Sequence, residues 1–249
     1  MASPSLNPVE IRSLVSSNDI SEIKTKVTEL ASSDSKQLSV LQQQQRTKVR
    51  VVLWNRILQL QQLENQENVR KEEIIESHEA IAKCWMDLGE HDKAIAQLAL
   101  ALETEPDSLT SLQLVGQALV STGEFAQALK AQERVLFLQK EGKQDTTKSR
   151  IQIAAVYEAR GEFDKAIDAL KQAETSISHA DGLDSPPDKE TRASLYEEMG
   201  KLYNLKGQYA EAVSALAKSR EILVQIKGEN DAQTQQVTYL LEMSSSLMD

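Results

Sequence analysis

The sequence predicts an all-α protein in which pairs of helices stack as a solenoid, and three observations carry this prediction. Residues that favour helices dominate the chain, which has only nine glycines and five prolines among 249 residues. No segment shows the alternation of apolar and polar residues that is typical of a β-strand. One eight-residue motif recurs four times, at 88–95, 122–129, 160–167 and 206–213, and such repetition is typical of repeat proteins.

Two short helices are expected in the first segment, residues 1–34. They cover 8–15 and 20–30, where apolar residues recur at helical spacing. Residues whose side chains can accept hydrogen bonds from free backbone N–H groups precede both helices. The candidate N-cap residues are Asn7 for the first helix and Asn18 or Asp19 for the second.

A long helix is expected from Ser35 to about Gln66, within the segment 35–74. Its apolar residues form two neighbouring stripes, so the helix is apolar around much of its circumference. We expect it to pack against the first repeat and to close that end of the solenoid. The stripes consist of Val49, Leu53, Ile57, Leu60 and Leu63, and of Val51, Trp54 and Leu58.

The repeated motif has a residue type for each of its physical tasks. Two antiparallel helices approach closely only where small side chains face each other, so the motif's alanine marks a helix crossing. The glycine ends the first helix of each pair, where a left-handed backbone carries no Cβ penalty, and the ring-bearing residue fills the gap at the turn. These positions are Gly89, Gly123, Gly161 and Gly207 for glycine, His91, Phe125, Phe163 and Tyr209 for the ring, and Ala94, Ala128, Ala166 and Ala212 for alanine.

This motif resembles the tetratricopeptide repeat (TPR) family, whose unit is about 34 residues long. From Gly89 to Gly123 the chain advances by 34 residues, and Pro106 stands where the family places a helix-ending proline. The resemblance implies a right-handed α-solenoid of TPR helix pairs, with non-repeat helices capping both ends. Four repeats are expected within 75–226, at 75–108, 109–142, 147–180 and 193–226.

Two connections between the motif glycines are longer than the family unit. Gly123 to Gly161 spans 38 residues, and Gly161 to Gly207 spans 46. The extra residues fit polar loops at 141–145 and 179–188, the second of which has helix breakers at both ends. Longer repeats of this kind resemble those of kinesin light chains.

A last helix is expected in residues 231–249. Val237, Leu240, Leu241 and Met248 are expected on one apolar face, with polar residues elsewhere. Because the last repeat would otherwise expose its stacking surface, a solenoid needs a terminal element of this kind. We therefore expect a C-terminal capping helix.

No arrangement of residues typical of catalysis occurs in the sequence, and the chain is predicted not to be an enzyme. It has neither a glycine-rich dinucleotide motif nor a phosphate-binding loop, and its histidines and single cysteine do not have zinc-ligand spacing. We expect no catalytic residue, no cofactor and no metal site. His91 is expected to pack in a turn, Cys84 to be a small buried thiol, and Ser185 to be either a proline-directed phosphorylation site or part of a loop rich in turn residues.

Charge and composition narrow the class of partner and the compartment. The net charge of −10 argues against a general nucleic-acid binder, because neutralising phosphates requires clustered Lys and Arg. The single cysteine fits a reducing compartment. The N-terminus does not resemble a signal peptide, and no apolar run is long enough to insert into a membrane. We expect a cytoplasmic protein, with the nucleus and the cytoskeleton left open.

The TPR resemblance implies a concave groove that is lined by the first helix of each repeat and binds a protein partner as a peptide or a helical segment. A subgroup of the family grips chaperone C-termini with a carboxylate clamp, but here Glu79 occupies one clamp position and would repel a carboxylate. The chain is therefore not expected to be a chaperone adaptor of that type. The expected groove residues are Glu79, Lys83, Gln113, Gln117, Lys148, Ile151, Ala155, Glu197 and Lys201.

The long N-terminal helix has a charge pattern unlike the rest of the chain. Between Lys36 and Leu63 there are five basic residues and no acidic one. One interpretation is a secondary docking patch for an acidic partner, and the other is an ordinary solvated face. The patch would consist of Arg46, Lys48, Arg50 and Arg56.

The sequence therefore predicts a non-catalytic adaptor or scaffold subunit that mediates protein–protein interaction in a multi-protein assembly. One alternative is a cytoskeleton- or motor-associated subunit, which the longer repeats suggest. Another is a docking subunit of an enzyme whose chemistry lies in its partner.

Overall fold

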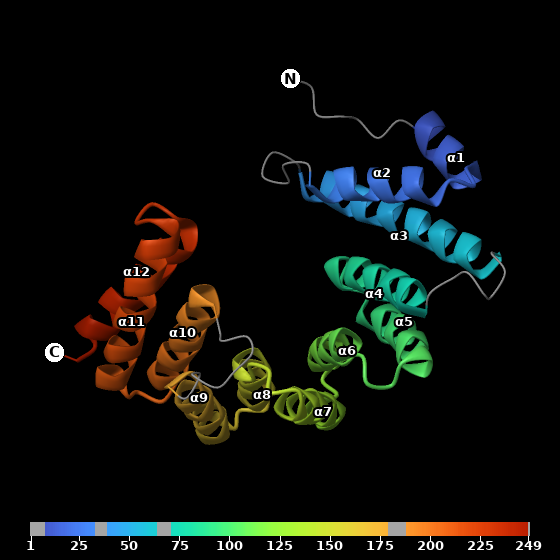
Figure 1. Ribbon diagram of the computed structural model, residues 1–249. Helices are drawn as coiled ribbons and strands as arrows, with labels where there is room; N and C mark the ends of the chain where they lie inside the picture. Colours follow the sequence, from blue (N-terminus) through green and yellow to red (C-terminus); the bar gives the residue numbers. More distant parts are fainter. Residues whose placement is uncertain (1–7, 33–38, 64–70, 179–187, 249) are drawn as a thin grey trace. The chain divides into compact units, whose positions relative to one another are not determined.

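A computed structural model describes residues 8–32, 39–63, 71–178 and 188–248 of the chain. Within these residues there are twelve α-helices and no β-strand (Figure 1), so the predicted all-α class is confirmed. The chain divides into two compact units, Met1–Glu124 and Phe125–Asp249. The cap candidate Asn7, most of the 179–188 loop and Ser185 lie outside the described residues.

The first unit begins with two short helices that pack on a long one. They are α1 (Pro8–Ser16), α2 (Ile20–Ser32) and α3 (Val40–Leu63). Asp19 is the N-cap of α2, because its Oδ1 accepts hydrogen bonds from the backbone N–H groups of Ser21 and Glu22 at 2.9 and 3.2 Å. The buried core of this part consists of Leu14, Ile23, Val27, Leu53, Ile57 and Leu60.

The other face of α3 packs on the first repeat helix, as predicted. The following helices are α4 (Lys71–Asp87), α5 (His91–Thr104) and α6 (Leu109–Thr122). Val51 and Leu58 of α3 meet Ile81 and Cys84 of α4 in one buried cluster. Burial raises the pKa of the Cys84 thiol above its ordinary value, so this cysteine is part of the core.

The second unit contains α7 (Phe125–Glu141), α8 (Thr147–Ala159), α9 (Phe163–Ser178), α10 (Lys189–Leu205), α11 (Tyr209–Lys227) and α12 (Ala232–Ser246). Its main core lies where α8, α9, α10 and α11 meet, and Leu170, Leu195, Leu202 and Ala212 are at its centre. Helix α12 packs on α11 through Val237, with Leu240 and Leu241 partly buried beside it. The expected C-terminal helix is therefore present.

The outer face of α12 differs from the expectation. Met248 was expected on the packed face, but it is 53 % exposed because α12 ends at Ser246 and Met248 leaves the helical phase. The solvent face is also not polar throughout, since Tyr239, Met243 and Leu247 are all exposed.

The motif glycines have the backbone geometry that the sequence predicts. The four glycines have φ angles between 71° and 83°, which is the left-handed region. At Gly123, for example, the next residue, Glu124, donates its backbone N–H to the carbonyl of Leu119 at 2.8 Å and so caps α6. The chain therefore reverses after each first helix within a short turn.

The alanines of the repeated motif are all buried. Ala94, Ala128, Ala166 and Ala212 are each fully buried. At Gly200 of α10 a Cβ atom would lie 2.5 Å from Cγ of Leu216 in α11. Close packing of α10 on α11 therefore requires a glycine at this position.

Candidate protein-binding surface

In the first unit, the candidate groove residues lie on α4 and α6. Glu79 is half-buried, and its Oε1 accepts hydrogen bonds from Oγ of Ser111 at 2.6 Å and of Ser108 at 3.2 Å. This carboxylate therefore ties α4 to the start of α6. Gln113 is half-buried, whereas the side chains of Lys83 and Gln117 are exposed and accessible to a partner.

In the second unit, the candidates on α8 are mostly accessible. Ala155 and Lys148 are exposed, and Nζ of Lys148 lies 3.5 Å from a carboxylate oxygen of Asp188. Ile151 is half-buried and packs against the main core of this unit. This face thus offers a cation and a small residue beside an apolar one.

The two candidates on α10 pair with each other, and Glu197 also connects α10 to α12. Nζ of Lys201 lies 2.6 Å from Oε1 of Glu197 and 2.9 Å from Oε1 of Glu198. Glu197 is only 6 % exposed, and its other oxygen accepts a hydrogen bond from Nε2 of Gln233 in α12 at 2.9 Å. Burial acts to lower the pKa of Lys201, but its hydrogen bonds to the two carboxylates raise it above the ordinary value. Lys201 and Glu197 are thus internally paired.

Glu158 of α8 adds a third carboxylate to this cluster. Its pKa is raised by burial and by the negative charge of Glu198, while Lys201 opposes the shift. Sequence reasoning did not identify the roles of Glu198 and Gln233. The three- and four-residue spacing from Glu197 and Glu198 to Lys201 could have identified these helical ion pairs.

The predicted basic patch is mostly engaged by the protein itself. Arg46 is buried, and Nη1 of Arg50 lies 3.8 Å from Oδ2 of Asp87. Arg56 donates hydrogen bonds to the carbonyl of Ser17 and to Oδ1 of Asn18. Of the four, Lys48 is the exposed side chain. As a partner contact this patch stays a prediction, with Lys48 as its accessible charge.

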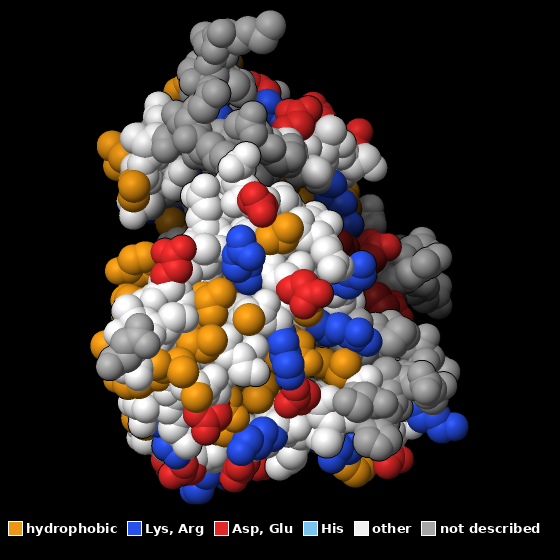
Figure 2. All heavy atoms as spheres, turned by 90° about the vertical axis from the view of Figure 1, so that its left-hand side faces the viewer, with side chains coloured by type: hydrophobic (Ala, Val, Ile, Leu, Met, Phe, Trp, Pro, Cys, Tyr) orange, Lys and Arg blue, Asp and Glu red, His pale blue; other side chains and the backbone are white. Residues whose placement is uncertain are grey.

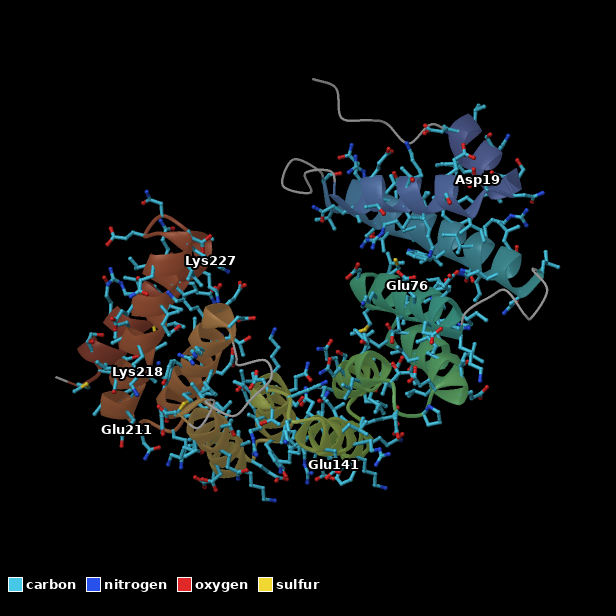
Figure 3. The ribbon with its side chains drawn as sticks, in the orientation of Figure 1. Asp19, Glu76, Glu141, Glu211, Lys218 and Lys227 are labelled. Atoms are coloured by element: carbon cyan, nitrogen blue, oxygen red, sulfur yellow. The ribbon has the colours of Figure 1, made fainter. Side chains whose placement is uncertain are left out.

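Ion pairs at the surface connect helices within each unit. In the first, Lys24 of α2 lies 3.4 Å from Glu76 of α4. In the second, Lys218 reaches Glu174 of α9 at 3.2 Å and Lys227 reaches Glu190 at 2.5 Å. Figure 3 labels Glu76, Lys218 and Lys227. Because such exposed pairs contribute about 0–1 kcal/mol each, they orient helices more than they stabilise the fold.

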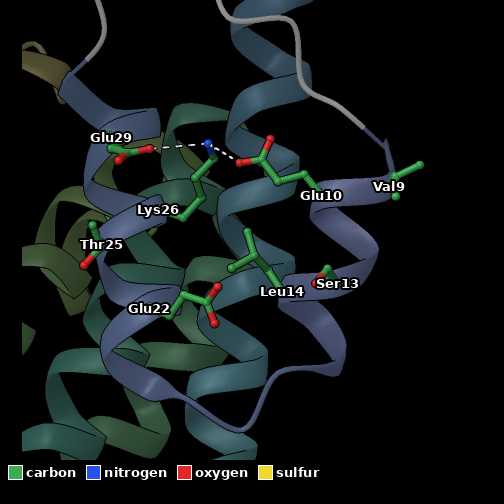
Figure 4. A pocket seen from close by; sticks show the side chains of 8 residues that line it. All are labelled: Val9, Glu10, Ser13, Leu14, Glu22, Thr25, Lys26 and Glu29. Atoms are coloured by element: carbon green, nitrogen blue, oxygen red, sulfur yellow. Dashed lines mark ion pairs between the residues drawn. The ribbon is translucent and has the colours of Figure 1, made fainter.

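Described residues line a hollow in each unit. One of about 620 Å³ lies between α1 and α2 (Figure 4), where Lys26 pairs with Glu10 at 2.6 Å and with Glu29 at 3.3 Å. The hydrogen bond to Glu10 is the main cause of the raised pKa of Lys26. The other, about 280 Å³, lies between α7, α8 and α9, with an apolar floor of Leu136, Ile153, Tyr157 and Ala169 and a charged rim. Charged side chains are part of the lining of both hollows.

Among the described residues, no group of three or more His, Cys, Asp or Glu side chains is placed to hold a metal ion. His78 is buried and its Nδ1 lies 2.9 Å from Oε1 of Gln97, while His91 is half-buried in its turn. None of the described helices is both long and apolar enough to cross a membrane.

Comparison with solved structures decides the fold. A protein of Podosopora anserina assigned as a kinesin light chain, with nearly identical TPR-like repeats, matches with a TM-score of 0.61 at 18 % identity, covering 83 % of this chain and 96 % of that one. A thermophilic TPR protein of Thermus thermophilus, TTC0263, matches with a TM-score of 0.58 at 17 % identity, covering 92 % and 99 %. MamA of Desulfovibrio magneticus matches with a TM-score of 0.55 at 13 % identity, covering 84 % and 97 %.

This chain has the tetratricopeptide-repeat fold. The predicted TPR resemblance is confirmed, including the likeness in fold to a kinesin-light-chain repeat structure. No protein-family model matches the chain. No curated protein matches it either.

The first helices of the four expected repeats correspond to α4, α6, α8 and α10. The accessible candidates on them are Lys83, Gln117, Lys148 and Ala155. Glu79, Glu197 and Lys201 make contacts inside their own units instead. The first-helix faces therefore combine accessible polar residues with a fixed polar network.

Proposed function

We propose that this chain is a non-catalytic TPR scaffold that binds a segment of a protein partner along the exposed faces of its first helices. The observation that carries the proposal is the accessibility of polar and small side chains on helices whose other faces form the core. Lys83 and Gln117 are exposed in the first unit, and Lys148 and Ala155 in the second.

The chemistry of these faces suits a polar, extended or helical segment. The amide of Gln117 both donates and accepts hydrogen bonds, so it can pair with a peptide backbone. The small side chain of Ala155 lets a backbone approach α8 closely. The two lysines favour acidic residues in the segment, and Lys148 is already placed beside Asp188 at 3.5 Å, so a partner carboxylate would compete with that weak pair.

A carboxylate clamp for chaperone C-termini does not fit this surface. Glu79 carries a negative charge at one clamp position and is fixed there by hydrogen bonds from Ser108 and Ser111. A partner's terminal carboxylate would meet this negative charge at a position where the clamp requires a group that binds carboxylates. We therefore do not propose that this chain is a chaperone adaptor of that type.

One observation favours a second candidate function, a motor- or cytoskeleton-associated subunit. The structural match with the highest TM-score among those described above is to a protein assigned as a kinesin light chain. At 18 % identity the match supports a shared fold but does not identify a partner. A docking subunit of an enzyme differs only in the identity of the partner, so the same experiment separates all three.

The test is affinity capture with the full chain, followed by quantitative mass spectrometry. Lys83→Glu, Gln117→Ala and Ala155→Arg, introduced together, should reduce recovery of the main partner at least tenfold, because they reverse a charge, remove a hydrogen-bonding amide and block the close approach of a backbone. Lys171 is also exposed, but it lies on α9, the expected second helix of its repeat. Lys171→Glu should therefore leave recovery unchanged. Equal recovery with both variants would contradict binding along the first helices.

Cellular location belongs to the same proposal. We place the chain in the cytoplasm, where its single cysteine would stay reduced. Fluorescence imaging of the tagged chain checks this, and accumulation on filaments or in the nucleus would instead support the motor-associated or a nuclear role.

A further inference from the structure

Exposed apolar side chains are concentrated on two helices. Among the described residues, thirteen large hydrophobic side chains are exposed, and eight of them lie on α3, on α12 or directly after α12. The others are scattered singly over the remaining helices, as is normal for a soluble protein. The eight are Val40, Leu41, Val52, Leu63, Tyr239, Met243, Leu247 and Met248.

On α3 three of these residues form a line, here called the α3 stripe: Leu41, Val52 and Leu63. They are spaced eleven residues apart, which is about three helical turns, so they share one side of the helix. Their exposures are 64 %, 48 % and 77 %. The opposite sides of α3 are occupied by α1, α2 and α4, so nothing in the described part of the chain covers this stripe.

On α12 the α12 stripe consists of Tyr239, Met243 and Leu247, spaced four residues apart. Their exposures are 63 %, 42 % and 51 %, whereas Val237 on the other side of the helix is fully buried against α11. An aromatic residue, a methionine and a leucine on one exposed face, with few charges, is the composition of an interface core.

The charges beside the two stripes are opposite. Helix α3 contains four basic residues and no acidic one, and Lys48 is exposed one turn from Val52. Helix α12 contains a single charged residue, the exposed Glu242, next to Met243. Each stripe therefore has one accessible charge beside its centre, and these two charges attract each other.

We propose that this protein self-associates, with the α12 stripe of one copy packing on α3 of a second copy around Val52, the middle residue of the α3 stripe. Glu242 then lies beside Lys48 of the second copy. The contact is heterologous, since two different surfaces meet, so each copy keeps one free stripe and assembly extends with concentration. Pairing of α12 with α12 of another copy is disfavoured, because both Glu242 side chains would lie on the same side of the seam.

Sedimentation velocity of the full chain over a range of about 1 to 200 μM tests the proposal. The average mass should rise above that of the monomer with concentration. Val52→Asp and Met243→Asp should each weaken association at least tenfold, because each places a charge in the apolar seam. Leu100→Asp on α5, where Leu100 is 42 % exposed like Met243, is the matched control and should not alter it. A monomer at every concentration would overturn the proposal.

Charge reversal tests which surfaces meet. Lys48→Glu and Glu242→Lys should each weaken association severalfold. An equimolar mixture of the two variants should assemble in alternation, because every contact between unlike variants then joins opposite charges. Both reversals in one chain should restore self-association. Two results would overturn the proposed pairing. Stronger self-association of the Glu242→Gln variant would indicate contact between α12 and α12 of another copy. An effect of the charge reversals on the melting temperature, without any effect on the average mass, would indicate a contact within one chain.

Discussion

Single residues at the helix crossings decide how closely the TPR helices pack. The sequence predicts these positions well, because the requirement for a small side chain is local to the motif. Ala166 and Ala128 were expected at crossings, and both are fully buried. For Gly200, only the structure shows that its close neighbour is Leu216, in the following helix.

Gly200→Ala should destabilise the protein despite the better helix propensity of alanine. Propensity would contribute roughly 1 kcal/mol of stability, but the new Cβ would lie 2.5 Å from Cγ of the fully buried Leu216. Overpacking of this kind costs about 1–3 kcal/mol, so the net effect is expected to be a loss of about 1 kcal/mol in urea unfolding.

Gly142→Ala is the matched control for Gly200→Ala. A Cβ there would meet its nearest neighbour at 3.5 Å, which is ordinary contact. This variant should be neutral or slightly stabilising. If Gly200→Ala is as stable as Gly142→Ala, then α10 and α11 do not pack as closely as described.

At the scale of the helix, sequence predicts where elements begin and end better than what their surfaces touch. Caps such as Asp19 and turns such as the one at Gly123 are local, so a short pattern identifies them. Arg56 of α3, in contrast, hydrogen-bonds Asn18, which lies 38 residues earlier, and Glu79 bonds Ser111, 32 residues later. No local pattern predicts such pairs, and so the basic patch and part of the expected groove turned out to be internally engaged.

Asp188 shows how a helix start should respond to pH. Its Oδ1 accepts the backbone N–H of Thr191 at 2.6 Å, and this bond is the main cause that lowers the pKa of Asp188. Because the pKa is lower in the folded protein, the stabilisation is present above the ordinary value of 3.8 and is lost as pH falls through the lower folded value. Asp188→Ala should cost about 1 kcal/mol at pH 7 and progressively less in strong acid.

Asp188→Asn separates capping from titration. Asparagine caps helices about as well as aspartate but does not titrate, so its stability at pH 7 should stay close to that of the natural chain. Chemical denaturation between pH 2 and 7 measures both variants. A difference between Asp188→Ala and the natural chain that is independent of pH would mean that the Asp188 carboxylate is not the group responsible.

At the scale of the whole molecule, α12 has two faces with different tasks. Its inner face covers the apolar surface of α11, and Gln233 adds a hydrogen bond to the buried Glu197. The sequence predicts the inner face from its apolar residues. The α12 stripe of Tyr239, Met243 and Leu247 was not predicted, because only polar residues were expected on the sides of the helix away from Val237.

One substitution on each face of α12 tests this division. Val237→Asp should cost at least about 3 kcal/mol or prevent folding, because it buries an unpaired charge where the natural residue is fully buried. Tyr239→Asp, at a side chain 63 % exposed, should change the unfolding free energy by no more than about 0.5 kcal/mol. Thermal and urea unfolding measure both. Equal losses would show that α12 does not pack through Val237.

The central claim, that a protein partner lies along the first helices, is tested most directly by site-specific photo-crosslinking in cells. A benzophenone side chain is placed at Gln117 of α6, at Lys148 of α8 or, as the control, at Lys171 of α9, all of which are exposed. We predict that the same partner is crosslinked from Gln117 and Lys148 and not from Lys171. A partner crosslinked from Lys171 but from neither first-helix position would contradict the account.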